Sequence, residues 1–479
     1  MTSRAIWWIR RDFRLDDNPA LVRAAQASAL LPVYIHSDGE EGAWPLGGAQ
    51  RWWLARSLTA FAAKLEQAGS RLTILEGEAA KTLVDLVKRY DVQEVVWNRR
   101  FEPAPLAQER RVEAALDALS VSWKAYCGNH LFDPEEVATK EGRPYQVYTP
   151  FSRNVRARPA PAQPKSAPKL LAAVDGAPSG VSIASLHLEP EIDWAAGFRA
   201  KWIPGEDTAL GRLRAFASGA MANYPTGRDQ PSVDGSSLLS PHLAFGEIGI
   251  RRVWHNALAS SSSPAASTDK FLAELLWREF GTHVLYHFPK TDLAPLRPEY
   301  ARFPWRNDRE ALRAWQRGQT GYPLVDAGMR QLWATGWMHN RVRMVVASFL
   351  VKHLLLPWQE GAKWFWDTLV DADLGNNSLG WQWAAGSGAD AAPYFRIFNP
   401  TSQAEKFDAE AEYIRRWVPE LARVPKQLAV APFDAPPLAL RAAGITLGVE
   451  YPHAIVEHTK ARERALAALT AVSKKASPA

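Results

Sequence analysis

The sequence of 479 residues contains a single cysteine, Cys127. One cysteine excludes an intramolecular disulfide and a cysteine-rich zinc site, and this usage is typical of a reducing cytosol. Long apolar runs are also missing, because the stretch Met344–Val351 is followed by Lys352 and is too short to cross a bilayer. The first residues lack the apolar core and cleavage site of a secretory signal. We therefore expect a cytoplasmic protein without membrane association.

Signatures of several common chemistries are absent as well. The sequence has no GxGxxG fingerprint and no P-loop, so the usual phosphate-binding motifs cannot supply a ligand. His283 and His287 stand four residues apart, but the glutamate of an HExxH motif and a third ligand are missing. We interpret the two histidines as structural and expect no metal. No nucleophile elbow is present, and hydrolysis is not supported.

Tryptophan is the residue that the sequence has in excess, with 21 copies, twelve of them after residue 250. Tryptophan serves in packing and in stacking, so a tryptophan-rich helical core is the simpler explanation. The net charge of +6 and the pI of about 9.2 suit a polyanionic partner, but 57 basic against 51 acidic residues is a modest excess. Composition alone does not identify nucleic acid.

Short β-rich runs alternate with helical segments between residue 5 and residue 132. The runs are AIWWI, LLPVYIH, RLTIL, EVVW and VSWKAY. This alternation predicts an α/β domain over residues 1–132 with a doubly wound parallel sheet. Ligands bind such sheets at the carboxyl ends of the strands, so the loop after Ile9 and the segment Gly47–Trp53 are candidate binding edges.

Composition changes after this region. Residues 133–202 include the Pro- and Ala-rich run ARPAPAQPKSAPK, which is typical of an interdomain connector. Residues 203–472 carry helical periodicity and predict an all-α domain, and residues 473–479 form a tail. Arginine, asparagine, glutamine and tryptophan gather in the last third, where they could contact phosphates and unstacked bases. A solvated helix face with buried tryptophans explains the same cluster equally well.

The segment Asp371–Phe398 decides between these alternatives, because it closely resembles the flavin-binding and catalytic signature of DNA photolyases and related cryptochromes. Other motifs similar to that family follow in its order, namely WWIRRDFRLDDNPAL, SSLLS, ELLWREF, TGYPLVDAGMRQL and GWMHNRVRM. The resemblance covers almost the whole chain. It implies an N-terminal α/β antenna domain and a helical domain that holds FAD in a folded conformation.

The resemblance also assigns residues to the flavin. Arg343 and Asp371 are expected to form an ion pair beside it, Asp373 to lie near the ribityl chain, and Asn377 to face N5, where a neutral amide favours the fully reduced state. A chain of tryptophans is expected to deliver electrons from the surface: Trp381, Trp358 and Trp305. The phosphates and ribityl chain are expected to be held by Tyr224, Ser236, Ser237, Leu238 and Ser240.

The family's lesion-contacting positions carry over in the same way. Glu274 is expected to hydrogen-bond the bases of the lesion, Trp277 and Trp383 to stack on them, and Asn340 and Met344 to line the pocket. The lesion would be flipped out of the duplex. The flanking DNA strand is expected to be gripped by Arg228, Arg341, Arg396, Gln403 and Lys406.

The implied activity is the light-driven repair of cyclobutane pyrimidine dimers by electron transfer from excited, reduced FAD, in a carbon–carbon lyase that acts as a monomer on UV-damaged DNA. Two alternatives stay open: a blue-light receptor of the cryptochrome type and a (6-4) photolyase. The absence of a long low-complexity C-terminal extension favours the enzyme. Enzymes that resemble the (6-4) branch have two successive histidines where this sequence has His339 and Asn340, and the asparagine favours cyclobutane dimers as the substrate.

An antenna chromophore is expected in the α/β domain. Pro105 stands where some family members hold methenyltetrahydrofolate through an acidic residue, so that binding mode is not expected. The segments GGAQRWWLARSL and SLGWQW resemble the bacterial class III branch and plant cryptochromes, in which a folate occupies another place, although class I remains open. We therefore favour methenyltetrahydrofolate over a deazaflavin.

Overall fold

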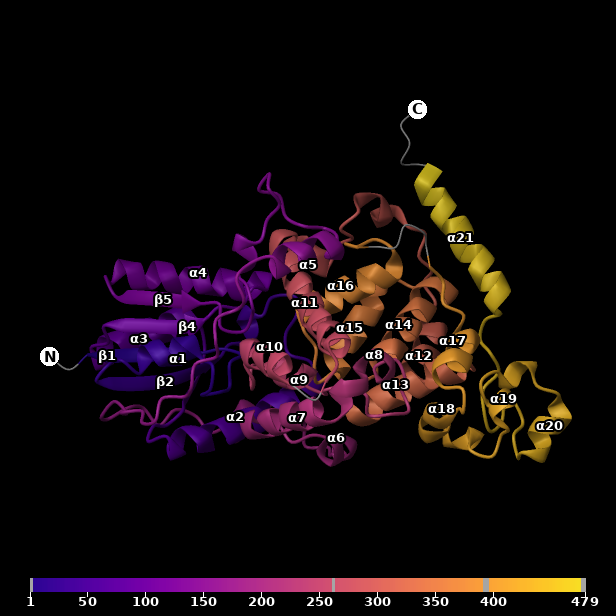
Figure 1. The fold of residues 1–479 in the computed structure, drawn as a ribbon, viewed down its shortest axis with the longest axis horizontal. Coiled ribbons are helices and arrows are strands. Elements are labelled where there is room, and N and C mark those ends of the chain that lie inside the picture. The colour runs from indigo at the N-terminus through magenta and orange to yellow at the C-terminus, as the bar shows by residue number, and fades with distance from the viewer. Residues whose placement is uncertain (1–2, 261–262, 391–395, 475–479) are drawn as a thin grey trace. The chain divides into compact units, whose positions relative to one another are not determined.

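The computed structural model describes residues 3–260, 263–390 and 396–474 and is shown in Figure 1. The chain divides into two compact units. The first unit comprises residues 1–222, 237–289 and 370–375, and the second comprises residues 223–236, 290–369 and 376–479. Each unit is built from segments that are distant in the sequence.

A parallel five-stranded sheet forms the centre of the first unit. Its order is β3-β2-β1-β4-β5, so the chain turns from one side of β1 to the other between β3 and β4. This topology confirms the predicted doubly wound sheet, and the five strands coincide with the five β-rich runs. Their bounds are β1 (Arg4–Ile9), β2 (Ala29–His36), β3 (Thr73–Glu76), β4 (Glu94–Asn98) and β5 (Ser122–Tyr126).

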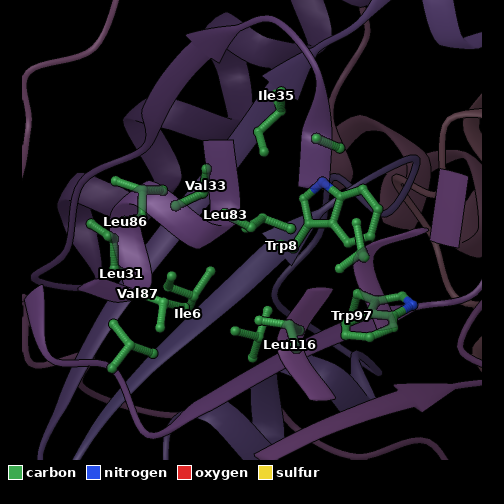
Figure 2. Close-up of a cluster of buried hydrophobic side chains, with 14 of the residues drawn as sticks. Ile6, Trp8, Leu31, Val33, Ile35, Leu83, Leu86, Val87, Trp97 and Leu116 are labelled. Atoms are coloured by element: carbon green, nitrogen blue, oxygen red, sulfur yellow. The ribbon is translucent and has the colours of Figure 1, made fainter. Parts of the chain in front are cut away.

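Alternating side chains of β1 fill the two faces of this sheet, as a strand that is covered on both sides requires. Ile6 and Trp8 point into a cluster with α3 (Ala79–Tyr90) and α4 (Pro103–Ala118), which Figure 2 shows in close-up. Trp7 points to the other face, where its ring meets Phe61 of α2 (Gly48–Gln67) edge-on at 5.7 Å. The short helix α1 (Pro19–Ala24) follows β1.

The proline-rich connector is attached to the first unit along much of its length. Leu30 N–H donates to Ala172 at 2.7 Å and Val181 N–H donates to Ile74 at 2.8 Å, while Leu171 and Val174 are buried. Its few apolar side chains explain this packing, which the composition of the segment does not suggest. The helices of this unit are α5 (Tyr148–Arg156), α6 (Ala196–Lys201), α7 (Glu206–Ser218), α9 (Ser240–Ala244), α10 (Ile250–Ala259) and α11 (Ala265–His287).

The second unit is helical, as predicted. Its helices are α8 (Tyr224–Gly227), α12 (Arg309–Arg317), α13 (Pro323–Thr335), α14 (Asn340–Ser348), α15 (Trp358–Thr368), α17 (Pro400–Phe407), α18 (Glu412–Trp417), α19 (Lys426–Ala429), α20 (Pro437–Ala442) and α21 (His458–Lys474), together with most of α16 (Leu374–Ala385). Of the predicted tail, residues 475–479 lie outside the described residues. Among the described helices, none has both the length and the apolar composition to cross a membrane.

The motif TGYPLVDAGMRQL builds the start of α13 around a buried carboxylate. Asp326 accepts hydrogen bonds from the N–H groups of Thr320 and Gly321 at 2.7 and 3.0 Å and from the hydroxyl of Tyr451 at 2.6 Å. Burial raises the pKa of Asp326. Since each of these donors needs a partner when it is removed from water, Asp326 stabilises the fold.

Candidate functional site

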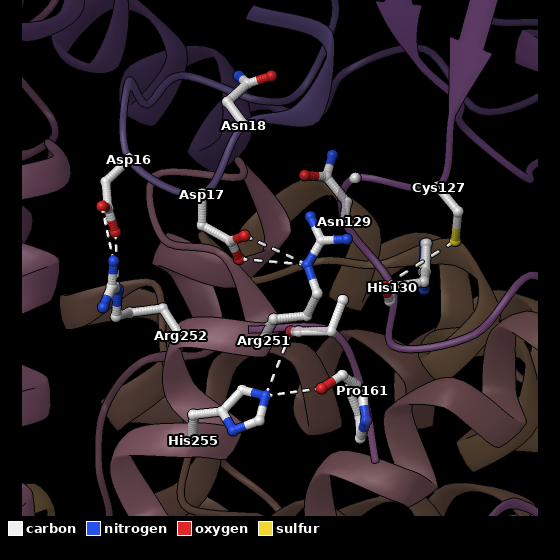
Figure 3. A network of polar contacts seen from close by, with 12 residues as sticks. Asp16, Asp17, Asn18, Cys127, Asn129, His130, Pro161, Arg251, Arg252 and His255 are labelled. Atoms are coloured by element: carbon white, nitrogen blue, oxygen red, sulfur yellow. Dashed lines mark hydrogen bonds and ion pairs between the residues drawn. The ribbon is translucent and has the colours of Figure 1, made fainter. Parts of the chain in front are cut away.

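The motif WWIRRDFRLDDNPAL forms a buried polar network after β1. Arg14 is fully buried and donates to the carbonyl groups of Gly128 and Gly246 at 2.7 and 2.9 Å. Asp16 and Asp17 reach α10, where they pair with Arg252 and Arg251 at 2.7 and 3.2 Å (Figure 3). The network fixes the loop after β1 against α10, so this part of the motif has a structural role.

The carboxyl edge of the sheet, which the sequence marks as a binding edge, is filled by charged side chains. Arg100 pairs with Glu41 at 2.8 Å and with Glu102 at 3.2 Å. Burial alone would raise the pKa of Glu102, but the charges of Arg100 and Arg11 lower it to about 2. The cavity lined by Arg100, Glu41, Tyr34 and their neighbours measures about 40 Å³, which holds a few water molecules.

Of the predicted flavin contacts, Ser237, Leu238, Ser240, Asp371 and Asp373 belong to the first unit. Leu238 has a φ of +52°, a left-handed conformation that costs a non-glycine residue roughly 1–3 kcal/mol and is concentrated at ligand sites. The hydroxyl of Ser237 accepts from the N–H of Leu239 at 3.4 Å. Asp371 is buried, and the amide of Gln50 on α2 donates to Ala372 at 2.9 Å, which anchors this segment.

The other predicted flavin contacts belong to the second unit. The amide nitrogen of Asn377 on α16 donates to the carbonyl of Ala362 on α15 at 3.0 Å. This bond uses one of the two amide N–H donors, fixes the orientation of the amide and leaves Oδ1 as an acceptor. Arg343 is fixed by a bond to Met338 at 2.8 Å, and Tyr224 is buried beneath the guanidinium of Arg228, at 5.7 Å.

The three predicted electron carriers lie in the second unit and differ in exposure. Trp381 and Trp358 are each 2% exposed, whereas Trp305 is half-buried beside Phe303, with ring centroids 4.3 Å apart. Trp381 meets Phe365 edge-on at 5.0 Å. A buried first donor and a more accessible last one agree with the predicted direction of electron flow, and the chain itself stays a prediction.

Helix α11 carries Glu274 and Trp277 on successive turns, both half-buried. Glu274 lies 3.7 Å from Lys270, one turn earlier. The indole of Trp277 is stacked face to face on the ring of Tyr148 from α5, with centroids 3.7 Å apart and planes inclined by 6°. Trp277 therefore has one face covered by an aromatic ring.

Basic side chains of α14 and α17 gather on one phenylalanine. The guanidinium of Arg341 lies 4.5 Å from the ring centroid of Phe407 and the ammonium of Lys406 lies 5.1 Å from it. Arg341 also pairs with Asp229 at 2.7 Å and approaches the sulfur of Met344 at 3.7 Å. These contacts bring together two residues that the resemblance assigns to DNA.

The start of α14 fixes the protonation of His339. Its Nδ1 accepts from the N–H of Arg341 at 3.2 Å, which caps the helix. Burial, followed by the charges of Arg343, Arg341 and Arg228, lowers the pKa of His339 to about 4 against the pull of Asp229. The imidazole is therefore neutral at pH 7. Asn340, the next residue, is exposed.

The remaining predicted contacts can be placed only one unit at a time. Arg396 and Lys406 are exposed, and Gln403, Trp383 and Ser236 are half-buried, all in the second unit. The Arg343–Asp371 ion pair and the complete lesion pocket would join residues of both units, and they stay predictions. The described residues contain no group of three side chains suited to a metal ion.

Sequence reasoning missed two contributors to this region. Tyr148 lies in the segment assigned to the connector, and only the fold brings its ring to Trp277. Asp229 follows the predicted DNA contact Arg228, but its pairing with Arg341 depends on the approach of α8 and α14. Both contacts join segments that are far apart in the sequence, so no local pattern could have indicated them.

Comparison with known proteins shows that the chain is similar to DNA photolyases along almost its whole length. Residues 5–169 match the family described as DNA photolyase, and residues 271–471 match the FAD binding domain of DNA photolyase. The deoxyribodipyrimidine photo-lyase of Agrobacterium fabrum is 48% identical over 99% of this chain and 99% of its own length. Cryptochrome-2 of Arabidopsis thaliana is 37% identical over 97% of this chain and 78% of its own length.

Solved structures agree with the sequence comparison. A bacterial class III photolyase from Agrobacterium tumefaciens superimposes with a TM-score of 0.96 at 47% identity, covering 99% of this chain and 98% of that one. The cryptochrome of Synechocystis superimposes with a TM-score of 0.89 at 28% identity, covering 98% of this chain and 99% of that one.

Proposed function

Because this chain belongs to the DNA photolyase family, we propose that it is a deoxyribodipyrimidine photo-lyase that repairs cyclobutane pyrimidine dimers in DNA under blue light. The observation that carries the proposal is the full-length similarity to a photo-lyase at 48% identity. The high structural similarity to a class III photolyase supports that class over class I. The proposed enzyme is a cytoplasmic monomer.

The donors near α16 fit a reduced flavin. Because the bond to Ala362 uses one of the two N–H donors of Asn377 and fixes the orientation of the amide, its Oδ1 would accept from the protonated N5 of a fully reduced ring. Tyr224, Ser236, Ser237, Leu238 and Ser240 would hold the phosphates and ribityl chain, and Arg343, Asp371 and Asp373 would surround the ring system. When bound, reduced FAD supplies on illumination the electron that opens the two bonds between the pyrimidines, and it takes the electron back.

The protein groups then position the lesion and neutralise charge. Glu274 would hydrogen-bond the bases, Trp277 and Trp383 would stack on them, and Asn340 and Met344 would line the pocket. The flipped nucleotides leave phosphates that need cationic partners. The cationic partners would be Arg228, Arg341, Arg396 and Lys406, of which Arg341 and Lys406 are neighbours on Phe407, and the neutral amide of Gln403 would donate a hydrogen bond to the same strand.

Protonation at the start of α14 favours dimers over (6-4) products. Repair of a (6-4) product moves a hydroxyl group between bases and requires a general acid. Here the Nδ1 of His339 is occupied by a backbone N–H and its pKa is about 4, while Asn340 has no proton to give near neutral pH. Splitting a cyclobutane dimer needs electron transfer and bond cleavage alone.

The antenna is proposed to be methenyltetrahydrofolate rather than a deazaflavin. A tricyclic deazaflavin at the carboxyl edge of the sheet would have to displace the paired side chains of Arg100 and Glu41, which line a cavity of about 40 Å³. Some family members hold a folate through an acidic residue at the position of Pro105. Pro105, whose carbonyl accepts from Arg10 at 2.9 Å, offers no acidic group for that binding mode. A folate in the class III position is consistent with both features.

A blue-light receptor is the second candidate, because Cryptochrome-2 is 37% identical to this chain. The two functions separate in one assay. Chemically reduced protein is illuminated with oligonucleotides that each carry one defined lesion, and products are separated by chromatography. We expect loss of the cyclobutane dimer under blue light, none in the dark and none for the (6-4) substrate. Failure to repair the dimer would favour the receptor, and repair of the (6-4) product would overturn the lesion assignment.

A further inference from the structure

Tyr148 and Trp277 form the closest face-to-face ring pair near the predicted lesion contacts. Their centroids are 3.7 Å apart and their planes are inclined by 6°. Phe280, one turn after Trp277, meets the two rings edge-on, at 5.9 Å from each. The described residues therefore cover one face and one edge of the indole with aromatic rings and provide no aromatic partner for its second face.

Tyr148 is itself anchored at both ends of its side chain. Its hydroxyl donates to the carbonyl of Ala273 on α11 at 2.8 Å, one turn before Trp277. Its backbone belongs to α5, where Phe151 packs on Phe280 at 5.2 Å. The ring thus spans from the turn that carries Glu274 to the indole of Trp277 and holds the two at a fixed spacing.

We propose that Tyr148 is a positioning residue that holds Trp277 as a rigid stacking wall and so leaves the second face of the indole for one base of the flipped dimer. The inference rests on the proposed function, which makes Trp277 a lesion contact. A free indole would lose rotamer freedom when the base binds, whereas an indole already stacked on Tyr148 has lost it in folding. Preorganisation of the indole therefore raises the affinity of the protein for the lesion and does not change its contacts with DNA phosphates.

The test is dark binding to two duplexes of the same sequence, one with a single cyclobutane dimer and one undamaged. We expect Tyr148→Leu to weaken binding of the damaged duplex by about 2- to 12-fold, the equivalent of the roughly 0.5–1.5 kcal/mol that an aromatic pair contributes. Binding of the undamaged duplex should stay the same. Tyr148→Phe keeps the stacked ring and should restore most of the affinity for the damaged duplex.

Tyr286→Leu is the matched control, because it removes a half-buried tyrosine from α11, the helix of Trp277. Tyr286 contacts the rings of Phe101 and His287, with no ring contact to Trp277. It should leave discrimination between the duplexes unchanged. In a Trp277→Leu background, Tyr148→Leu should have no further effect on lesion binding, since there is no indole left to position.

The outcomes separate this inference from the function on which it rests. If Trp277→Leu weakens lesion binding while Tyr148→Leu does not, the positioning role is wrong and the lesion contact stands. If Tyr148→Leu strengthens lesion binding, Tyr148 competes with the base for the indole face and the inference is overturned. If Trp277→Leu leaves lesion binding unchanged, the assignment of the lesion contact itself fails.

Discussion

Gly361 on α15 is packed directly against the proposed first electron carrier, so replacing it with alanine tests the position of Trp381. A Cβ atom at Gly361 would overlap three carbons of the Trp381 indole, Cη2, Cζ3 and Cζ2, the last at 2.5 Å. Carbon atoms in ordinary contact lie about 3.5–4.0 Å apart, so the ring would have to move by roughly 1 Å or more. Trp315 and Phe365, both buried, meet the same ring at 6.1 and 5.0 Å and oppose that movement.

Overpacking of this kind costs about 1–3 kcal/mol, while replacing a helical glycine with alanine returns up to about 1 kcal/mol of helix propensity. Gly380→Ala is the matched control, because Gly380 lies on α16 beside Trp381 and its Cβ would meet nothing within 4 Å. We expect the free energy of unfolding of Gly361→Ala to fall below that of Gly380→Ala by about 1–3 kcal/mol in urea titrations.

The same pair of variants reports on electron transfer. Trp381→Phe should block the photoreduction of oxidised flavin and spare repair by chemically reduced enzyme, because the two electron routes have different donors. Gly361→Ala should slow photoreduction, and its unfolding penalty should shrink in the Trp381→Phe background, where the three overlapping carbons are gone. Equal stability of the two alanine variants, together with an unchanged rate of flavin bleaching under blue light, would refute this packing.

Three further outcomes are expected. Glu274→Gln should bind damaged DNA but repair it with a lower quantum yield, because an amide keeps an acceptor oxygen and loses the charge; an unchanged yield in steady-state repair assays argues against the role of Glu274. The plot of log affinity against log salt should have a slope on the order of 3–6, and Lys406→Ala should reduce it by about one. Arg341→Ala should reduce the slope by less than Lys406→Ala, because Asp229 already neutralises Arg341; equal reductions would contradict that pairing. The pKa of His339 falls from an ordinary 6.5 to about 4, so the unfolded chain binds more protons between these values; the free energy of unfolding is therefore complete above pH 6.5 and falls by up to about 3 kcal/mol as the pH approaches 4. His339→Asn keeps a helix cap and should make the free energy of unfolding, measured by urea titration at each pH, depend less on pH in this range. An unchanged dependence on pH would contradict a neutral His339.

The strands of the first unit were predictable because they depend on short-range pattern. AIWWI is apolar throughout and EVVW is apolar after Glu94, as strands buried on both faces are, and the two pair in the register Trp8↔Trp97. The packing of the connector was not predictable, because Leu171 and Val174 stand among prolines and alanines whose composition suggests a free segment. Backbone hydrogen bonds to β2 and β3 attach it together with these buried apolar side chains.

In the candidate site, too, residue identities were predictable from the sequence and tertiary contacts were not. Asn377 was assigned by resemblance, but the direction of its amide follows from Ala362 on a neighbouring helix. The pairing of Tyr148 with Trp277 and the fit of Trp381 over Gly361 depend on how helices approach one another. The sequence alone shows which chemical groups are present at each position, whereas the direction of each side chain depends on contacts between segments that are distant in the sequence.

The motif after β1 shows that a position at the carboxyl edge of a parallel sheet does not by itself identify a ligand contact. WWIRRDFRLDDNPAL stands at a predicted ligand-binding edge, and its four charged side chains after Ile9 and before Asp16 invite the assignment of an anion site. Arg14, however, is fully buried, with its donors on the carbonyl groups of Asp17, Gly128 and Gly246, and so has none to offer a ligand. Removing its charge would leave those acceptors buried without partners, which costs about 1–3 kcal/mol each. A loss of antenna or flavin in an Arg14 variant would therefore report on folding, and the residues that contact chromophores must be sought among side chains such as Asn377 that keep a free acceptor.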